Sequence, residues 1–168
     1  LSYRPDEGTT LSAMFDPLQT ESPDSAPWFF APQGFNTRDS ILLDREEARH
    51  AAGSKRLAEG ESITLFDGRG HIARCTIRSI EKKGRDVTVE VGEVKPLPAP
   101  APFIELAFAL PKGDRLNTLL AMVVPLGVNA LRPLRCARSV ATFGEKSDER
   151  WQRIMIEACK QSRRAHLP

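Results

Sequence analysis

The chain has 168 residues, which is enough for one domain or two small ones. A hydrophobic fraction of 40% supports a buried core, and 24 basic against 22 acidic residues leave a net charge of only +2. Net charge alone therefore makes no case for nucleic-acid binding, and the distribution of charge carries more information. No apolar run is long enough to cross a membrane, and the N-terminus lacks the pattern of a secretory signal.

Residues 1–27 are rich in Pro, Ser, Thr, Asp and Glu and poor in periodic apolar residues, so we expect them to be disordered. Their charges are mainly acidic, whereas Lys and Arg gather after residue 131, which indicates a polyanion partner for the C-terminal part. The chain starts with Leu1 rather than Met, and this indicates a fragment or a misplaced start. The widely separated Cys75, Cys136 and Cys159 exclude a metal-ligand spacing and predict buried free thiols in a reducing cytoplasm.

The segment 28–95 has the pattern of a small β-barrel, because short alternating strands follow one another with glycine turns between them. The expected strands cover 40–43, 62–67, 71–80 and 87–91. Turns are expected at 67–70 and 82–86. Asp44 is predicted to cap a short helix that runs to about residue 56.

The proline-rich segment 96–102 predicts an extended linker, after which the pattern changes to that of an α/β sheet. Strands are expected at 103–110 and 128–134, on either side of a helix over 116–126. That helix is apolar on nearly every side, so we expect it to be buried, and Pro125 should end it. The tight turn at 110–115 lies between strand and helix, where α/β sheets often place their chemistry.

The last expected helix begins near Ser147 or Asp148 and has one apolar face and one charged face. The apolar face contains Trp151, Ile154, Met155 and Ala158. The charged face contains Arg150, Arg153, Glu157 and Lys160.

Several of these pieces, in this order, resemble the RsmE-like family of bacterial 16S ribosomal RNA uridine N3-methyltransferases. The matching positions are 30–32, His50, Arg56, 65–70, 110–115, 126–128, 138–139, 151–154, 157–158, 161–162 and Arg164. The resemblance implies an α+β and α/β architecture. In it a PUA-like RNA-binding β-barrel (28–95) is followed by the first part of a SPOUT-type α/β, trefoil-knot methyltransferase domain (103–168). It also implies S-adenosylmethionine as the methyl donor, the small ribosomal subunit as the partner, a cytoplasmic location and a homodimer at full length, with no metal and no membrane.

The chain departs from the family's pattern in two places. The glycine-rich and Leu-Arg-Thr-Glu loops of the family's knot are absent because the sequence stops at Pro168, so no cofactor-binding residue is assigned and this piece is predicted to be inactive alone. Asn117, Ala121, Met122 and Pro125 stand where the family usually has Glu, Gln, Lys and Glu.

The catalytic residues stay unassigned, and the resemblance gives six candidates for RNA contacts: Arg56, Lys112, Arg115, Arg138, Gln161 and Arg164. The alternative for Lys112 and Arg115 is a solvated turn. For Arg138, Gln161 and Arg164 the alternatives are the dimer partner and a surface salt bridge, and the salt bridge is favoured for Arg164. Asp114 is expected to cap the helix that follows it, and Trp151 to belong to the core. The leading hypothesis is an rRNA methyltransferase; the alternative is a non-catalytic RNA-binding or dimerisation module derived from that family.

Overall fold

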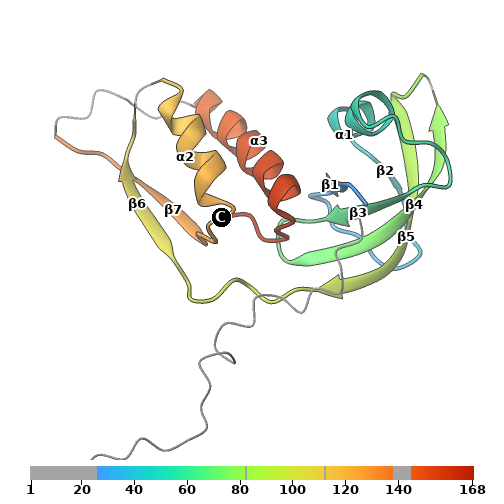
Figure 1. Ribbon diagram of the computed structural model, residues 1–168, viewed down its shortest axis with the longest axis horizontal. Helices are drawn as coiled ribbons and strands as arrows, with labels where there is room; N and C mark the ends of the chain where they lie inside the picture. The colour runs from blue at the N-terminus through green and yellow to red at the C-terminus, as the bar shows by residue number, and fades with distance from the viewer. Residues whose placement is uncertain (1–25, 82, 112, 138–144) are drawn as a thin grey trace, which may run out of the picture.

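The computed structural model describes residues 26–81, 83–111, 113–137 and 145–168. One side of the molecule holds a curled sheet and a short helix, and the other holds two helices beside a pair of strands (Figure 1). The elements in chain order are β1 (Trp28–Phe30), β2 (Ser40–Leu42), α1 (Arg45–Arg49), η2 (His50–Ser54), β3 (Ser62–Phe66), β4 (His71–Glu81), β5 (Asp86–Pro96), β6 (Glu105–Ala109), α2 (Arg115–Val123), β7 (Ala130–Leu134) and α3 (Glu145–Ser162).

The first sheet has five strands in the order β1-β3-β4-β5-β2. β3, β4, β5 and β2 pair antiparallel, whereas β1 joins β3 in parallel. Because the sheet curls, Phe29 of β1 and Ile41 of β2 share one core with Ile63, Val89 and the helix residue Ala48. This core follows from the alternation read in the sequence, since every second residue of β5 from Val87 to Val91 is buried.

A bulge in β5 lets the long hairpin of β4 and β5 bend. The pairing shifts between Ala73 and Cys75, and Gly92 lies there with its Cα so close to β4 that an added Cβ would meet the Arg74 carbonyl oxygen at 2.5 Å. Only backbone movement relieves that contact.

We expect Gly92→Ala to lower the free energy of unfolding by about 1–3 kcal/mol, because it overpacks backbone against backbone. The measurement is the urea denaturation midpoint. Gly53→Ala is the matched control: no heavy atom lies within 4 Å of its added Cβ, so stability should stay equal or rise slightly. Equal effects of the two substitutions would contradict the role given to the bulge.

The helix after β2 starts as predicted. The Asp44 carboxylate accepts hydrogen bonds from the backbone N–H groups of Glu46 and Glu47, both at 2.8 Å, and so caps α1. The expectation of one helix up to residue 56 was wrong in its second half, because the chain widens into the π-helix η2 at His50 and leaves it at Ser54.

The second part consists of the parallel pair β6 and β7, with α2 and α3 packed beside it. α2 ends at Val123, before Pro125, so the proline stops the helix as predicted, although the helix was expected to reach residue 126. Its burial was predicted wrongly. The helix buries Leu116, Leu120 and Val123 but exposes Met122. Among the described residues, the elements that pack against α2 cover only one of its sides.

Two further differences concern the linker and the cysteines. β5 continues to Pro96, the first residue of the expected linker. All three cysteines are free, but only Cys75 and Cys159 are buried, and Cys136 is exposed. Burial raises the pKa of Cys75 to about 11 and the pKa of Cys159 to about 12, so both thiols stay protonated at neutral pH.

Candidate functional site

Helix α3 connects the two parts of the molecule and carries the candidate residue Gln161, with Arg164 just past its end. Its apolar side packs on α2, and its C-terminal half reaches the curled sheet (Figure 1). Arg150 near its start contacts Asp114 at the start of α2 at 3.4 Å, and Arg164 just past its end donates to the Val124 carbonyl oxygen at the end of α2. The two helices therefore run in the same direction.

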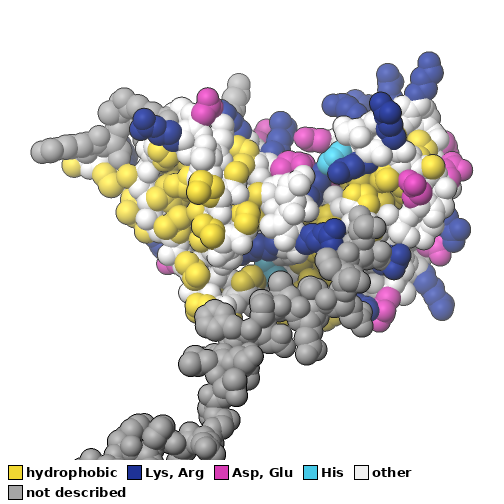
Figure 2. Space-filling model, in the orientation of Figure 1, with side chains coloured by type: hydrophobic (Ala, Val, Ile, Leu, Met, Phe, Trp, Pro, Cys, Tyr) yellow, Lys and Arg dark blue, Asp and Glu magenta, His cyan; other side chains and the backbone are white. Residues whose placement is uncertain are grey.

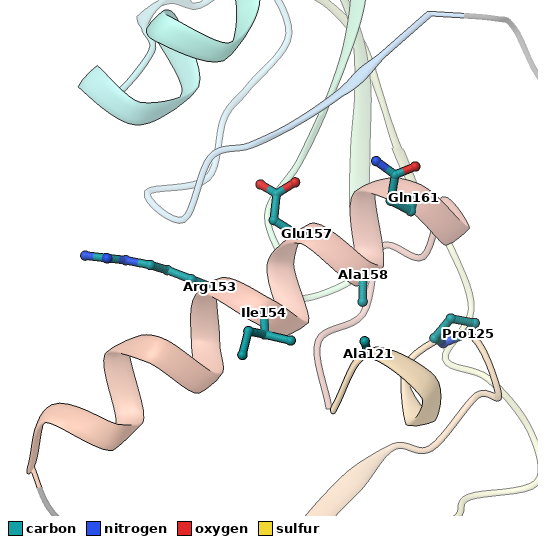
Figure 3. A pocket seen from close by; sticks show the side chains of 7 residues that line it. All are labelled: Ala121, Pro125, Arg153, Ile154, Glu157, Ala158 and Gln161. Atoms are coloured by element: carbon teal, nitrogen blue, oxygen red, sulfur yellow. The ribbon is translucent and has the colours of Figure 1, made fainter. Parts of the chain in front are cut away.

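A groove of about 460 Å³ lies between α2 and α3. Its walls are Ala121 and Pro125 on the α2 side and Ile154 and Ala158 on α3, and its remaining lining residues are Arg153, Glu157 and Gln161. Figure 3 shows Ile154 and Ala158 pointing toward α2, whereas Arg153, Glu157 and Gln161 point away from it. The groove thus has apolar walls on both helices and a polar rim on α3.

A buried ion cluster fixes α3 to α1. The Lys160 ammonium donates to both carboxylate oxygens of Glu47, at 2.9 and 3.1 Å, and to Glu157 at 2.7 Å. It also donates to His50 Nδ1 at 3.2 Å and lies 5.9 Å from the ring centre of Phe29. The side chains of Lys160 and Glu47 are only 5% and 6% exposed.

The pKa shifts in this cluster follow from burial and from the neighbouring charges. Burial is the main cause that raises the pKa of Glu47, against the opposing effect of Lys160. Burial alone would lower the pKa of Lys160, but its hydrogen bond to Glu157 and the charge of Glu47 outweigh burial and raise it. Burial and then Lys160 lower the pKa of His50, so His50 stays neutral and accepts the hydrogen bond.

The turn at 67–70 is hydrogen-bonded to residues 165–167 near the C-terminus. Asp67 is buried and accepts from the backbone of Arg69 and His71, and these hydrogen bonds lower its pKa although burial acts in the other direction. The outer edge of the turn pairs with residues 165–167: the Gly70 N–H donates to the Ala165 carbonyl, and the Leu167 N–H donates to the Gly68 carbonyl. The turn was predicted only as a hairpin connection, and nothing in the local sequence signals this partner.

The structure separates the candidate RNA-contact residues. Arg56 is exposed just after η2, Arg115 is exposed at the start of α2, and Gln161 is exposed at the rim of the groove near the end of α3. Arg115 and Gln161 therefore lie at opposite ends of the same helix pair, about three helical turns apart. Lys112 and Arg138 lie outside the described residues.

Arg164 was placed on the surface by the sequence analysis, and that was wrong. Its side chain is buried at 8% exposure, and Nη1 donates to the Val124 carbonyl oxygen at 2.8 Å, which caps α2. Burial also lowers its pKa. Within the described part of the chain, its Nε and Nη2 have no hydrogen-bond partner. A residue so enclosed does not reach RNA phosphates in this structure.

Two other expectations have clear outcomes. Asp114 occupies the N-cap position of α2, but its side chain makes no cap; it accepts from Asn117 and Arg150 instead. Trp151 lies on α3 and packs, partly buried, against the core that α2 and the parallel strands form, as predicted. No helix of the described residues is long and apolar enough to span a bilayer, and among those same residues no cluster of His, Cys, Asp and Glu could hold a metal ion.

Two family comparisons match successive parts of the chain. Residues 43–90 match an RNA methyltransferase PUA domain, and residues 98–168 match an RNA methyltransferase domain. Ribosomal RNA small subunit methyltransferase E is 31% identical in Mycobacterium bovis, over 76% of this chain and 49% of that protein. The chain thus spans about half the length of the curated relatives it matches.

Solved structures agree with the sequence matches. The crystal structure of a ribosomal RNA small subunit methyltransferase E from Neisseria gonorrhoeae, bound to S-adenosyl methionine, superposes with a TM-score of 0.76 at 31% identity. The similarity covers 85% of this chain and 60% of that one.

Proposed function

Because the chain belongs to the RNA methyltransferase family that includes ribosomal RNA small subunit methyltransferase E, we propose that it takes part in methylating 16S ribosomal RNA. The observation that carries the proposal is the order of its two parts, a PUA domain followed by a methyltransferase domain in one continuous fold. The predicted fold class, a PUA-like domain followed by an α/β methyltransferase fold, is confirmed by the same comparisons.

In this proposal the reaction transfers a methyl group from S-adenosylmethionine to N3 of a uridine, in a cytoplasmic homodimer. The base must be held out of its stack, and cations must hold the neighbouring phosphates. Arg56, Arg115 and Gln161 are exposed and able to make such contacts. We keep these three as proposed RNA-contact residues.

The groove between α2 and α3 does not fit the methyl donor. S-adenosylmethionine carries an adenine, a ribose and charged groups, which require hydrogen-bond partners aimed into the pocket. The groove between α2 and α3 has walls of Ala121, Pro125, Ile154 and Ala158, and its polar side chains point away from α2 (Figure 3). We therefore assign no cofactor-binding residue here. We propose that this polypeptide supplies RNA binding and transfers no methyl group alone, which favours the RNA-binding module as the second candidate.

The test combines filter binding of 16S rRNA with methyl incorporation from labelled S-adenosylmethionine. We expect RNA binding and no incorporation above background. Log affinity falls with log salt, and Arg115→Ala should make this dependence shallower by about 0.7, the value for one lost single-strand phosphate contact. The control is Arg132→Ala, an exposed arginine that is ion-paired with Glu105 at 2.6 Å. Absence of RNA binding would overturn the proposed function, and methyl incorporation would overturn the proposed inactivity.

A further inference from the structure

The part of the molecule with the curled sheet carries a basic cleft. Figure 1 places α1 and the turn between β4 and β5 at the end of the molecule opposite β6 and β7. The cleft has a volume of about 450 Å³ between α1 and the turn that joins β4 to β5. Its lining residues are Arg45, Arg49, Lys83, Gly84 and Arg85. Figure 2 shows Lys and Arg side chains gathered over these two elements. Of the described residues, no acidic one lines the cleft.

Among the described residues, the four cations of this cleft have no ion pair of the kind that other arginines and lysines possess. Arg78 pairs with Glu90, Arg132 with Glu105 and Lys160 with Glu47. For Arg45, Arg49, Lys83 and Arg85 there is no such carboxylate partner within the described part of the chain. Like charges that face one cavity repel each other, and an anion from outside relieves that repulsion.

The carboxylates of α1 do not neutralise the cleft, because they face α3. Glu47 is held by Lys160, and Glu46 lies 4.0 Å from Arg153. Arg45 and Arg49, one helical turn apart, occupy the same side of α1. Helix α1 thus directs Glu46 and Glu47 toward α3, and it directs Arg45 and Arg49 toward the cleft.

The other wall of the cleft is a fixed turn. The N–H groups of Gly84 and Arg85 both donate to the Glu81 carbonyl oxygen, at 3.0 and 3.2 Å. Gly84 packs so tightly on η2 that an added Cβ would lie 2.6 Å from the Ala52 Cβ. These contacts fix the backbone from which the Arg85 side chain projects, which lowers the backbone entropy lost on binding.

From these observations we infer that the cleft formed by Arg45, Arg49, Lys83 and Arg85 binds the phosphodiester backbone of RNA, as a second contact distant from the methyltransferase part. The inference rests on the proposed function. Guanidinium groups match phosphate oxygens in paired hydrogen bonds, and contacts of this kind position an RNA without reading its sequence.

The test measures binding of a single-stranded oligouridylate to the full 168-residue chain over a range of salt concentrations. We expect the triple variant Arg45→Ala, Arg49→Ala, Arg85→Ala to bind at least about tenfold more weakly at low salt, with the salt slope lower by about 2. The control removes three cations elsewhere that are already paired: Arg78→Ala, Lys95→Ala, Arg132→Ala. It should leave the slope nearly unchanged. Arg85→Gln alone, a mild surface change, should lower the slope by about 0.7.

The outcomes separate this inference from the proposed function. If the wild-type chain binds RNA and the triple variant binds equally well, the cleft is not a contact, while the proposed function stands. If the triple variant and the control lose the same affinity, the effect is one of net charge and the inference fails. If the wild-type chain binds no RNA, both fail.

Discussion

Replacing Lys160 by Met should lower the free energy of unfolding by about 3–5 kcal/mol, because it leaves the buried Glu47 carboxylate without its cation. The side chains have similar lengths, so little packing is lost. Guanidinium chloride denaturation at neutral pH measures the effect. The double variant Glu47→Gln, Lys160→Met should recover much of the loss, since it buries no charge.

The matched control is Arg153→Met on the same helix. Arg153 and Glu46 are both largely exposed and 4.0 Å apart, so their ion pair should contribute about 0–1 kcal/mol. If Lys160→Met costs no more than Arg153→Met, the cluster does not hold α3 to α1.

The same variant has a predictable pH dependence. The pKa of Lys160 is raised, so its stabilisation is present below about pH 10.5 and is lost as the pH rises through the higher folded value. Burial raises the pKa of Glu47, and without Lys160 this carboxyl must be protonated still more readily. The deficit of Lys160→Met should therefore shrink as the pH falls toward 4.5, the ordinary pKa of a glutamate carboxyl.

Much of the fold could be predicted from periodicity. The strands β3, β4 and β5 were found because alternation reports directly which face of a strand is buried. The cap at Asp44, the stop at Pro125 and the apolar face of α3 were also found, since each depends on residues within a few positions of one another.

The site was predicted less well, because burial of a charge depends on partners far along the chain. Lys160 was placed on the solvent face of α3, yet its partner Glu47 is 113 residues away in sequence. Arg164 was placed on the surface, yet a carbonyl 40 residues earlier holds it. Periodicity assigns a face to a residue, but it does not reveal that a second element with the complementary charge packs against that face.

Replacing Phe66 by Ala should lower the free energy of unfolding by about 3–5 kcal/mol and loosen the contact between the sheet and α3. Phe66 is 0% exposed, and its ring centre lies 5.5 Å from that of Trp28 and 5.2 Å from that of Phe30. These rings form one core with Val124, Ala158 and Cys159 from the other part of the molecule. The cavity left by the missing ring therefore opens at the junction of the two parts.

Thiol labelling distinguishes loosening of that junction from general unfolding. In the wild type the exposed Cys136 should react with a maleimide, while the buried Cys75 and Cys159 stay protected. In Phe66→Ala the labelling of Cys159 should accelerate more than that of Cys75, because Cys159 belongs to the junction core and Cys75 to the core of the sheet. Phe103→Ala, at a phenylalanine 73% exposed, should change stability by less than about 0.5 kcal/mol and leave both thiols protected. Equal acceleration at Cys75 and Cys159 would mean that the two cores open together, and the junction would then have no stability of its own.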